Sequence, residues 1–171
     1  DEMEELRIAA WMHDIGKITT PEHLVSKTNK LEGIFDRVEL LETRFALIRQ
    51  SFENEYLKRK LDVLETGQID PEQQKTLDQL STELAGRTSA LAGELDLLRR
   101  INTDKQQANE ETVLLVGSIA EKTFRLDGQE QPYLSPEEAE CLSIIRGNLL
   151  SSERKVIEHH AEMTRRITRE L

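Results

Sequence analysis

The feature that most constrains the fold is a series of apolar residues spaced alternately three and four positions apart. The series comprises Leu31, Ile34, Val38, Leu41, Phe45, Ile48 and Phe52. A second series comprises Leu77, Leu80, Leu84, Leu91, Leu95 and Leu98, with Thr88 at a weak position. Because this spacing lines one face of a helix with apolar side chains, each series predicts a long helix with a heptad seam.

The segment between the two series predicts a turn. Gly67 is typical of a residue that ends a helix, and Asp70-Pro71 is typical of an N-cap followed by a first helical residue. We therefore predict that residues 31–64 and 75–101 form two long helices, paired as a coiled-coil-like antiparallel hairpin. The two seams are expected to pack against each other.

The rest of the sequence also favours an all-α fold. Gly (8) and Pro (4) are few, aromatic residues make up 4% of the chain, and no alternating, strand-like stretch stands out. The other expected helices are a first one from about Glu4 to His13, a short one with Thr20 as N-cap and Pro21 as first residue, and three over 109–123, from Ser135 onward and from Ser151 or Ser152 to the end.

Charge and cysteine content restrict the partners and the compartment. The formal net charge of −10 argues against duplex nucleic acid, whose binding depends on Lys and Arg neutralising phosphates. Cys141 is the only cysteine, which excludes an internal disulfide and fits a cytoplasmic protein. No run of about 18 apolar residues predicts a membrane span. Both ends of the sequence lie within helical patterns, so we expect a piece of a larger protein.

His13 and Asp14 adjoin at the end of the first predicted helix, and Gly16 and Lys17 follow. Neighbouring helical side chains diverge by about 100°, so the pair cannot chelate one ion as an i, i+4 pair would. If both bind metal, other elements must supply further ligands, with Asp14 bridging two ions and Lys17 balancing a phosphate. The alternative is an ordinary helix end with a terminal glycine and cation. His23 is expected to face solvent or to cap a helix.

Two longer segments carry a more specific pattern. They read LRIAAWMHDIGKITTPEHLVSK at residues 6–27 and GNLLSSERKVIEHHAEMTRRI at residues 147–167. In this order they resemble two consecutive segments of the HD-GYP family. That family is the branch of the HD metal-dependent phosphohydrolase superfamily that hydrolyses cyclic di-GMP.

The resemblance implies a metal-dependent phosphodiesterase that takes part in bacterial signalling. It makes His13, Asp14 and His160 metal ligands and places Lys17 beside the substrate phosphate, whereas His159 is not a ligand. It also implies two or three divalent ions, with iron or manganese favoured by the His and carboxylate ligands. The expected substrate is a cyclic dinucleotide, hydrolysed to the linear dinucleotide or GMP with Asp14 and Lys17 at the reaction centre.

The sequence also departs from the family's pattern. The family joins its two segments almost directly, whereas here roughly 115 residues separate them. We therefore expect residues 1–30 and 147–171 to be parts of one HD-GYP-like domain, interrupted by an inserted helical region over 31–146. The family's upstream His or Glu ligand, its later His-His-Glu motif and its Gly-Tyr-Pro signature are absent from the 171 residues. The isolated chain is therefore expected to be inactive and the full-length protein active.

Two other functions fit parts of the sequence. The heptad seams favour a catalytically incomplete helical module for interaction or signalling, which would form a homodimer or bind a signalling partner through the inserted region. A generic HD nucleotide phosphohydrolase fits the His-Asp pair but leaves the segment over 147–167 unexplained.

Overall fold

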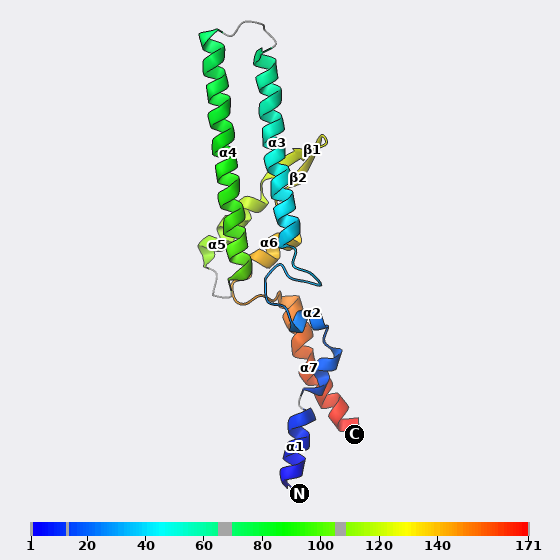
Figure 1. Cartoon of the computed structure of the whole chain (residues 1–171). Coiled ribbons are helices and arrows are strands. Elements are labelled where there is room, and N and C mark those ends of the chain that lie inside the picture. Colours follow the sequence, from blue (N-terminus) through cyan, green and yellow to red (C-terminus); the bar gives the residue numbers. More distant parts are fainter. Residues whose placement is uncertain (1, 13, 65–69, 105–108, 171) are drawn as a thin grey trace.

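The computed structural model describes residues 2–12, 14–64, 70–104 and 109–170. Its elements are α1 (Glu2–Met12), the 3-10 helix η1 (Ile15–Thr19), α2 (Glu22–Val25), α3 (Val38–Leu64), α4 (Pro71–Thr103), α5 (Glu110–Ala120), β1 (Thr123–Leu126), β2 (Gln129–Pro132), α6 (Pro136–Leu142) and α7 (Ser151–Glu170). Figure 1 shows an elongated molecule, with α3 and α4 at one end and α1, α2 and α7 toward the other. The predicted all-α fold is confirmed, with a small two-stranded sheet added.

Helices α3 and α4 form the predicted antiparallel hairpin, lying side by side along their length (Figure 1). Three ion pairs between the two helices define the antiparallel register. From one pair to the next, the residue number on α3 decreases while that of its partner on α4 increases. The pairs are Arg59 with Glu83 at 3.0 Å, Glu55 with Arg87 at 2.9 Å, and Glu42 with Arg99 at 2.8 Å. These pairs are solvent-exposed and report the alignment rather than supplying much stability.

The main stabilisation comes from the seams, which bury several of the predicted apolar side chains and leave Val38, Leu77, Leu84 and Leu95 partly buried. The buried residues are Leu41, Phe45, Ile48 and Phe52 on α3, and Leu80, Leu91, Leu98 and Ile101 on α4. Helices α5 and α6 and the sheet complete this core with Val116, Ile119, Phe124, Tyr133, Leu134, Cys141 and Leu142. The Tyr133 ring makes edge-to-face contacts with Phe45 at 5.9 Å and Phe124 at 6.2 Å between ring centroids.

The first predicted helix of the hairpin starts seven residues later than expected, at Val38. The Leu31 N–H donates to Asn102 Oδ1 at 2.7 Å, which holds residue 31 in a loop against the end of α4. The Asp36 carboxylate then accepts a hydrogen bond from the Val38 N–H at 3.0 Å and starts the helix. Leu31 is still fully buried, whereas Ile34 is 88% exposed and belongs to no seam.

The predicted caps are largely confirmed. Asp70 and Gln73 form a capping box ahead of Pro71, and Ser135 and Glu138 form one ahead of Pro136. Helix α2 starts one residue later than predicted, because Pro21 rather than Thr20 occupies the N-cap position. Gly67 lies outside the described residues.

The antiparallel sheet was not expected from the sequence, and the helix predicted over 109–123 ends at Ala120. Strands β1 and β2 are joined by Asp127-Gly128, whose φ angles are +51° and +80°. Two successive residues in this left-handed region make the tight turn that connects hairpin strands, and Asp-Gly is a favoured pair for it. The dipeptide was the available signal, but its flanking strands are only four residues long.

A nearly buried ion pair ties α6 to α3. Arg44 donates to both carboxylate oxygens of Glu138, at 2.5 and 3.2 Å, and also to the Tyr133 carbonyl at 3.2 Å. Burial alone would raise the pKa of Glu138. The hydrogen bonds from Arg44 and from Ser135 outweigh burial and lower that pKa below its ordinary value of 4.5. None of the described helices is long and apolar enough to cross a membrane.

The lowered pKa of Glu138 predicts a pH-dependent contribution to stability. A depressed pKa stabilises the folded chain fully above the unfolded-state pKa, and the contribution disappears as pH falls through the folded-state value. At pH 7 we expect Glu138→Gln to lower the free energy of unfolding by about 1.5–3 kcal/mol. The difference from wild type should shrink as pH falls from 5 to 3 in urea titrations. A difference that stayed constant over this range would contradict the assignment.

The hairpin core predicts a large effect at Phe45, which is almost fully buried. Phe45→Ala removes the contact with Tyr133 and should lower the free energy of unfolding by about 3–5 kcal/mol. Leu114→Ala on α5 is the control, because Leu114 is 73% exposed, and its effect should stay within about 0.5 kcal/mol. Equal effects of the two substitutions in chemical denaturation would show that Phe45 is not a core residue.

Candidate functional site

The two ends of the 31–146 region meet at a neck, which comprises residues 27–30 and 144–153. Lys30 Nζ donates to the Ile144 carbonyl at 2.8 Å, and Asn148 Nδ2 donates to the Lys27 carbonyl at 2.6 Å. The chain therefore leaves the first segment at residue 30 and returns beside it more than 110 residues later. This is the geometry that a tolerated insertion requires.

A buried ion pair holds the neck together. Lys27 Nζ lies 2.9 Å from both carboxylate oxygens of Glu153, and the Lys27 side chain is fully buried. Glu153 Oε2 also accepts the Leu150 N–H at 2.8 Å, immediately before α7 begins. One carboxylate thus caps α7 and joins it to the segment that follows α2.

Beyond the neck, η1 packs against α7 through a direct backbone approach at Gly16. The Gly16 N–H donates to Thr164 Oγ1 at 2.9 Å across 148 residues of sequence. A Cβ at position 16 would collide with the His160 carbonyl oxygen and with Thr164. Glycine is required here because α7 occupies the space of any side chain. The Gly16 turn and the His160 turn are therefore in contact.

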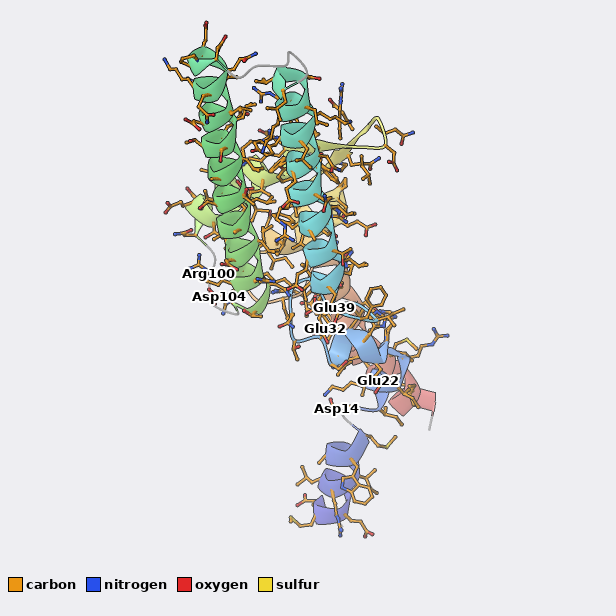
Figure 2. The ribbon with its side chains drawn as sticks, turned by 45° about the horizontal axis from the view of Figure 1, so that its top comes forward. Asp14, Glu22, Glu32, Glu39, Arg100 and Asp104 are labelled. Carbon is orange, nitrogen blue, oxygen red and sulfur yellow. The ribbon has the colours of Figure 1, made fainter. Side chains whose placement is uncertain are left out.

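Asp14 and Lys17 lie at the start of η1 and form an ion pair. Lys17 Nζ lies 2.7 Å from Asp14 Oδ2, and the Lys17 N–H donates to the Asp14 carbonyl at 2.9 Å. Both side chains are partly exposed. Figure 2 shows Asp14 between α1 and η1, well away from Arg100 and Asp104 at the base of α4. His13 lies outside the described residues.

His159 and His160 have different surroundings on α7. His160 is partly buried, and its Nδ1 is hydrogen-bonded to the Ile157 carbonyl. A carbonyl only accepts, so Nδ1 is the donor in this contact, and Nε2 is the nitrogen that a metal would use. His159 is exposed, with Nδ1 3.3 Å from Glu162 Oε2. His160 is therefore the better metal ligand of the two.

Asp14 and His160, two expected metal ligands, lie in segments that contact each other at Gly16 and Thr164. Within the described ranges, no three His, Cys, Asp or Glu side chains converge as a metal-binding group. Asp14 and His160 have the right donor atoms, a carboxylate and an imidazole with its second nitrogen hydrogen-bonded. These donor atoms therefore fit a divalent ion chemically, but two ligands alone do not complete its coordination.

Sequence reasoning did not identify three residues that position this site. Thr164 holds the Gly16 N–H, and Lys27 and Glu153 fix the start of α7. Thr164 lies four residues after His160, one helical turn further along the same face, and this spacing was the available signal. Lys27 and Glu153 are ordinary charged residues in the sequence, so only the fold shows that they pair.

Comparison with models of known protein families gave no match. Comparisons with curated proteins and with solved structures gave none either. The assignment of a function therefore depends on the residues and their arrangement.

The close approach at Gly16 predicts that alanine destabilises the protein at Gly16 but stabilises it at Gly86. Gly16→Ala should separate η1 from α7 and lower the melting temperature, because the new methyl group meets backbone atoms of α7. Gly86→Ala is the control, since no described neighbour lies within 4 Å of its Cβ position in the middle of α4. It should raise the free energy of unfolding by about 0.5–1 kcal/mol. Hydrogen exchange should show faster exchange in α7 for Gly16→Ala alone, and unchanged exchange there would contradict the packing.

Proposed function

We propose that the chain is part of a metal-dependent phosphodiesterase of the HD-GYP type, which hydrolyses cyclic di-GMP in the full-length protein. The observation that carries the proposal is the contact between Gly16 and α7 at His160 and Thr164. The two segments that resemble the family are adjacent in space although an inserted region separates them in sequence. Such a contact is needed if one site takes ligands from both segments.

Each residue of the proposed site has a distinct role. His13, Asp14 and His160 would hold the ions, with His160 using Nε2 and Asp14 using its carboxylate. The bound ions would lower the pKa of a water molecule and polarise the phosphodiester oxygens. The Ile157 carbonyl fixes the His160 tautomer, and Thr164 keeps the segment that carries Asp14 against α7. The cytoplasmic localisation expected from the single cysteine belongs to the same proposal.

Lys17 would stabilise negative charge on the substrate. Its ammonium group lies 2.7 Å from the Asp14 carboxylate, so a cation is fixed beside the proposed ligand. Charge that develops on a phosphate oxygen near Asp14 would then be offset by Lys17 as well as by the ions. A group with this role affects the rate of hydrolysis more than the binding of metal.

The proposal predicts how four substitutions change the full-length protein. Asp14→Ala and His160→Ala should reduce turnover of cyclic di-GMP by at least about a hundredfold and lower the metal content, because each removes a ligand. Lys17→Ala should slow turnover and leave the metal content unchanged. His159→Ala is the matched control, since it changes the neighbouring exposed histidine, and it should retain activity. The assay follows the linear dinucleotide and GMP with added Mn²⁺ or Fe²⁺, together with metal analysis.

Three results would contradict the proposal. Undiminished activity of the Asp14→Ala protein would refute the site, and equal losses for His159→Ala and His160→Ala would refute the choice of ligand. An inactive, metal-free full-length protein would favour the helical interaction module. That second function is supported by a specific feature of α3, a row of exposed leucines on its outer face.

A further inference from the structure

Helix α3 carries a second apolar row on the side that faces away from α4. The row comprises the exposed residues Leu40, Leu47, Leu57, Leu61 and Leu64. At 100° per residue Leu57 and Leu61 lie opposite the side chains buried against α4, and Leu40, Leu47 and Leu64 lie about 110–130° from the mean direction of those side chains. The buried side chains are Leu41, Phe45, Ile48 and Phe52. We call this row, together with Asn54 and Gln50, the outer seam.

The outer seam has the spacing of a coiled coil. Leu40, Leu47, Asn54 and Leu61 are seven residues apart, and Leu57 and Leu64 follow the last two of them by three. These are the a and d positions of a heptad. If α4 were the only partner of α3, apolar residues would be needed only on the face of α3 that is buried against α4. Charged residues would normally cover the opposite face.

Asn54 is informative because it is a polar residue at an a position. In parallel coiled coils a single Asn there selects the two-stranded state and fixes the register, since it pairs with its counterpart in the other helix. Gln50 Nε2 lies 3.4 Å from Asn54 Oδ1, a weak contact that leaves the amide able to bond across an interface.

The charges that flank the outer seam match a second copy of the same helix. Glu53 precedes Asn54 at a g position, and Lys58 follows at the next e position. In a parallel pair, Glu53 of each copy meets Lys58 of the other. An antiparallel pair with the best overlap of leucines would instead bring the two Glu53 carboxylates together. Charge complementarity therefore favours a parallel arrangement.

The structure also leaves space beside the outer seam. Helix α3 and the sheet enclose an open groove of about 780 Å³, lined on the α3 side by residues that include Leu47, Gln50, Asn54 and Lys58. The Ser51 hydroxyl donates to the Arg125 carbonyl at 3.0 Å, which attaches the sheet to α3 next to Gln50. The sheet therefore borders the groove along Leu47, Gln50 and Asn54, and a second helix would approach the seam from its open side.

We propose that the outer seam of α3 binds the same seam of a second copy, forming a parallel two-stranded coiled coil and hence a homodimer. The paired helices would bury Leu40, Leu47, Leu57, Leu61 and Leu64 of each copy, with Asn54 against Asn54. The proposal does not depend on the phosphodiesterase function. It places the two necks at the same end of the dimer.

The oligomeric state of the 171-residue chain tests the interface. Light scattering and sedimentation should show a dimer for wild type and a helical monomer for the Leu57→Asp/Leu61→Asp variant. Leu114→Asp is the control, because it puts the same charge on an exposed leucine of α5, and it should remain dimeric. A wild-type chain that stays monomeric at about 100 µM, well above the concentrations at which stable dimers form, overturns the proposal. A dimer that survives the double substitution also overturns it.

Charge exchange tests the pairing with variants that keep their fold. Lys58→Glu should raise the dimer dissociation constant severalfold, because each Glu53 then faces a like charge. The Glu53→Lys/Lys58→Glu double variant should restore wild-type affinity. Failure of the double variant to restore affinity contradicts the proposed pairing.

Cysteine cross-linking tests the direction. Leu61→Cys should form a covalent dimer on oxidation, since equivalent a positions face each other in a parallel pair, and wild type should not because Cys141 is buried. Absence of the Leu61→Cys cross-link from a dimeric protein overturns the parallel arrangement.

Discussion

The buried ion pair between Lys27 and Glu153 is the interaction on which the arrangement of the two parts depends. It lies where the chain leaves the first segment and where it returns, and the same carboxylate caps α7. Breaking such a pair leaves a buried charge without a partner, at a cost of about 3–5 kcal/mol. Lys30, next to it, donates to the Ile144 carbonyl, and burial lowers the pKa of Lys30 although Asp104 acts to raise it. Two buried cations thus hold the neck, and Leu150 of the neck packs against the apolar cluster.

Most of the buried apolar residues lie in one part of the molecule, although Leu24 of α2 is also buried. The buried apolar cluster belongs to the hairpin, α5, the sheet and α6, with Leu31 at its lower boundary. Toward the other end, η1 and α7 are joined by the Gly16 backbone and the Thr164 hydroxyl. The buried apolar cluster therefore lies within residues 31–142, whereas the contact of η1 with α7 includes a hydrogen bond at Gly16.

The sequence predicted those features that depend on neighbouring residues. The three-four spacing located both long helices, and Asp70-Pro71 and Ser135-Pro136 located two helix starts. It placed the start of α3 too early because the heptad spacing extends back through Leu31. The Asn102 side chain, 71 residues away, holds Leu31 out of the helix, and no local pattern records that contact. The short strands were missed since four-residue segments carry little periodic signal.

The candidate site could likewise be predicted only in part. The motif residues Asp14, Lys17 and His160 could be named from the sequence, but the contact that joins their segments involves a glycine and a threonine. Neither residue type indicates a partner 148 positions away. His159 and His160 are likewise alike in sequence. The structure distinguishes them, because His160 is hydrogen-bonded to the Ile157 carbonyl and His159 is exposed beside Glu162.

The narrow neck has a mechanical consequence for the long hairpin. Helix α4 has 33 residues and is about 50 Å long, yet the region that contains it is connected to η1 and α7 through the neck. If the hairpin rotates about the neck, it acts as a lever whose short arm is the segment carrying Glu153 and, further along α7, His160. A rotation of about 5° at the neck moves the far end of α4 by about 4 Å. Conversely, a displacement of several ångströms at the far end is reduced to a fine adjustment of the α7 face that contacts Gly16.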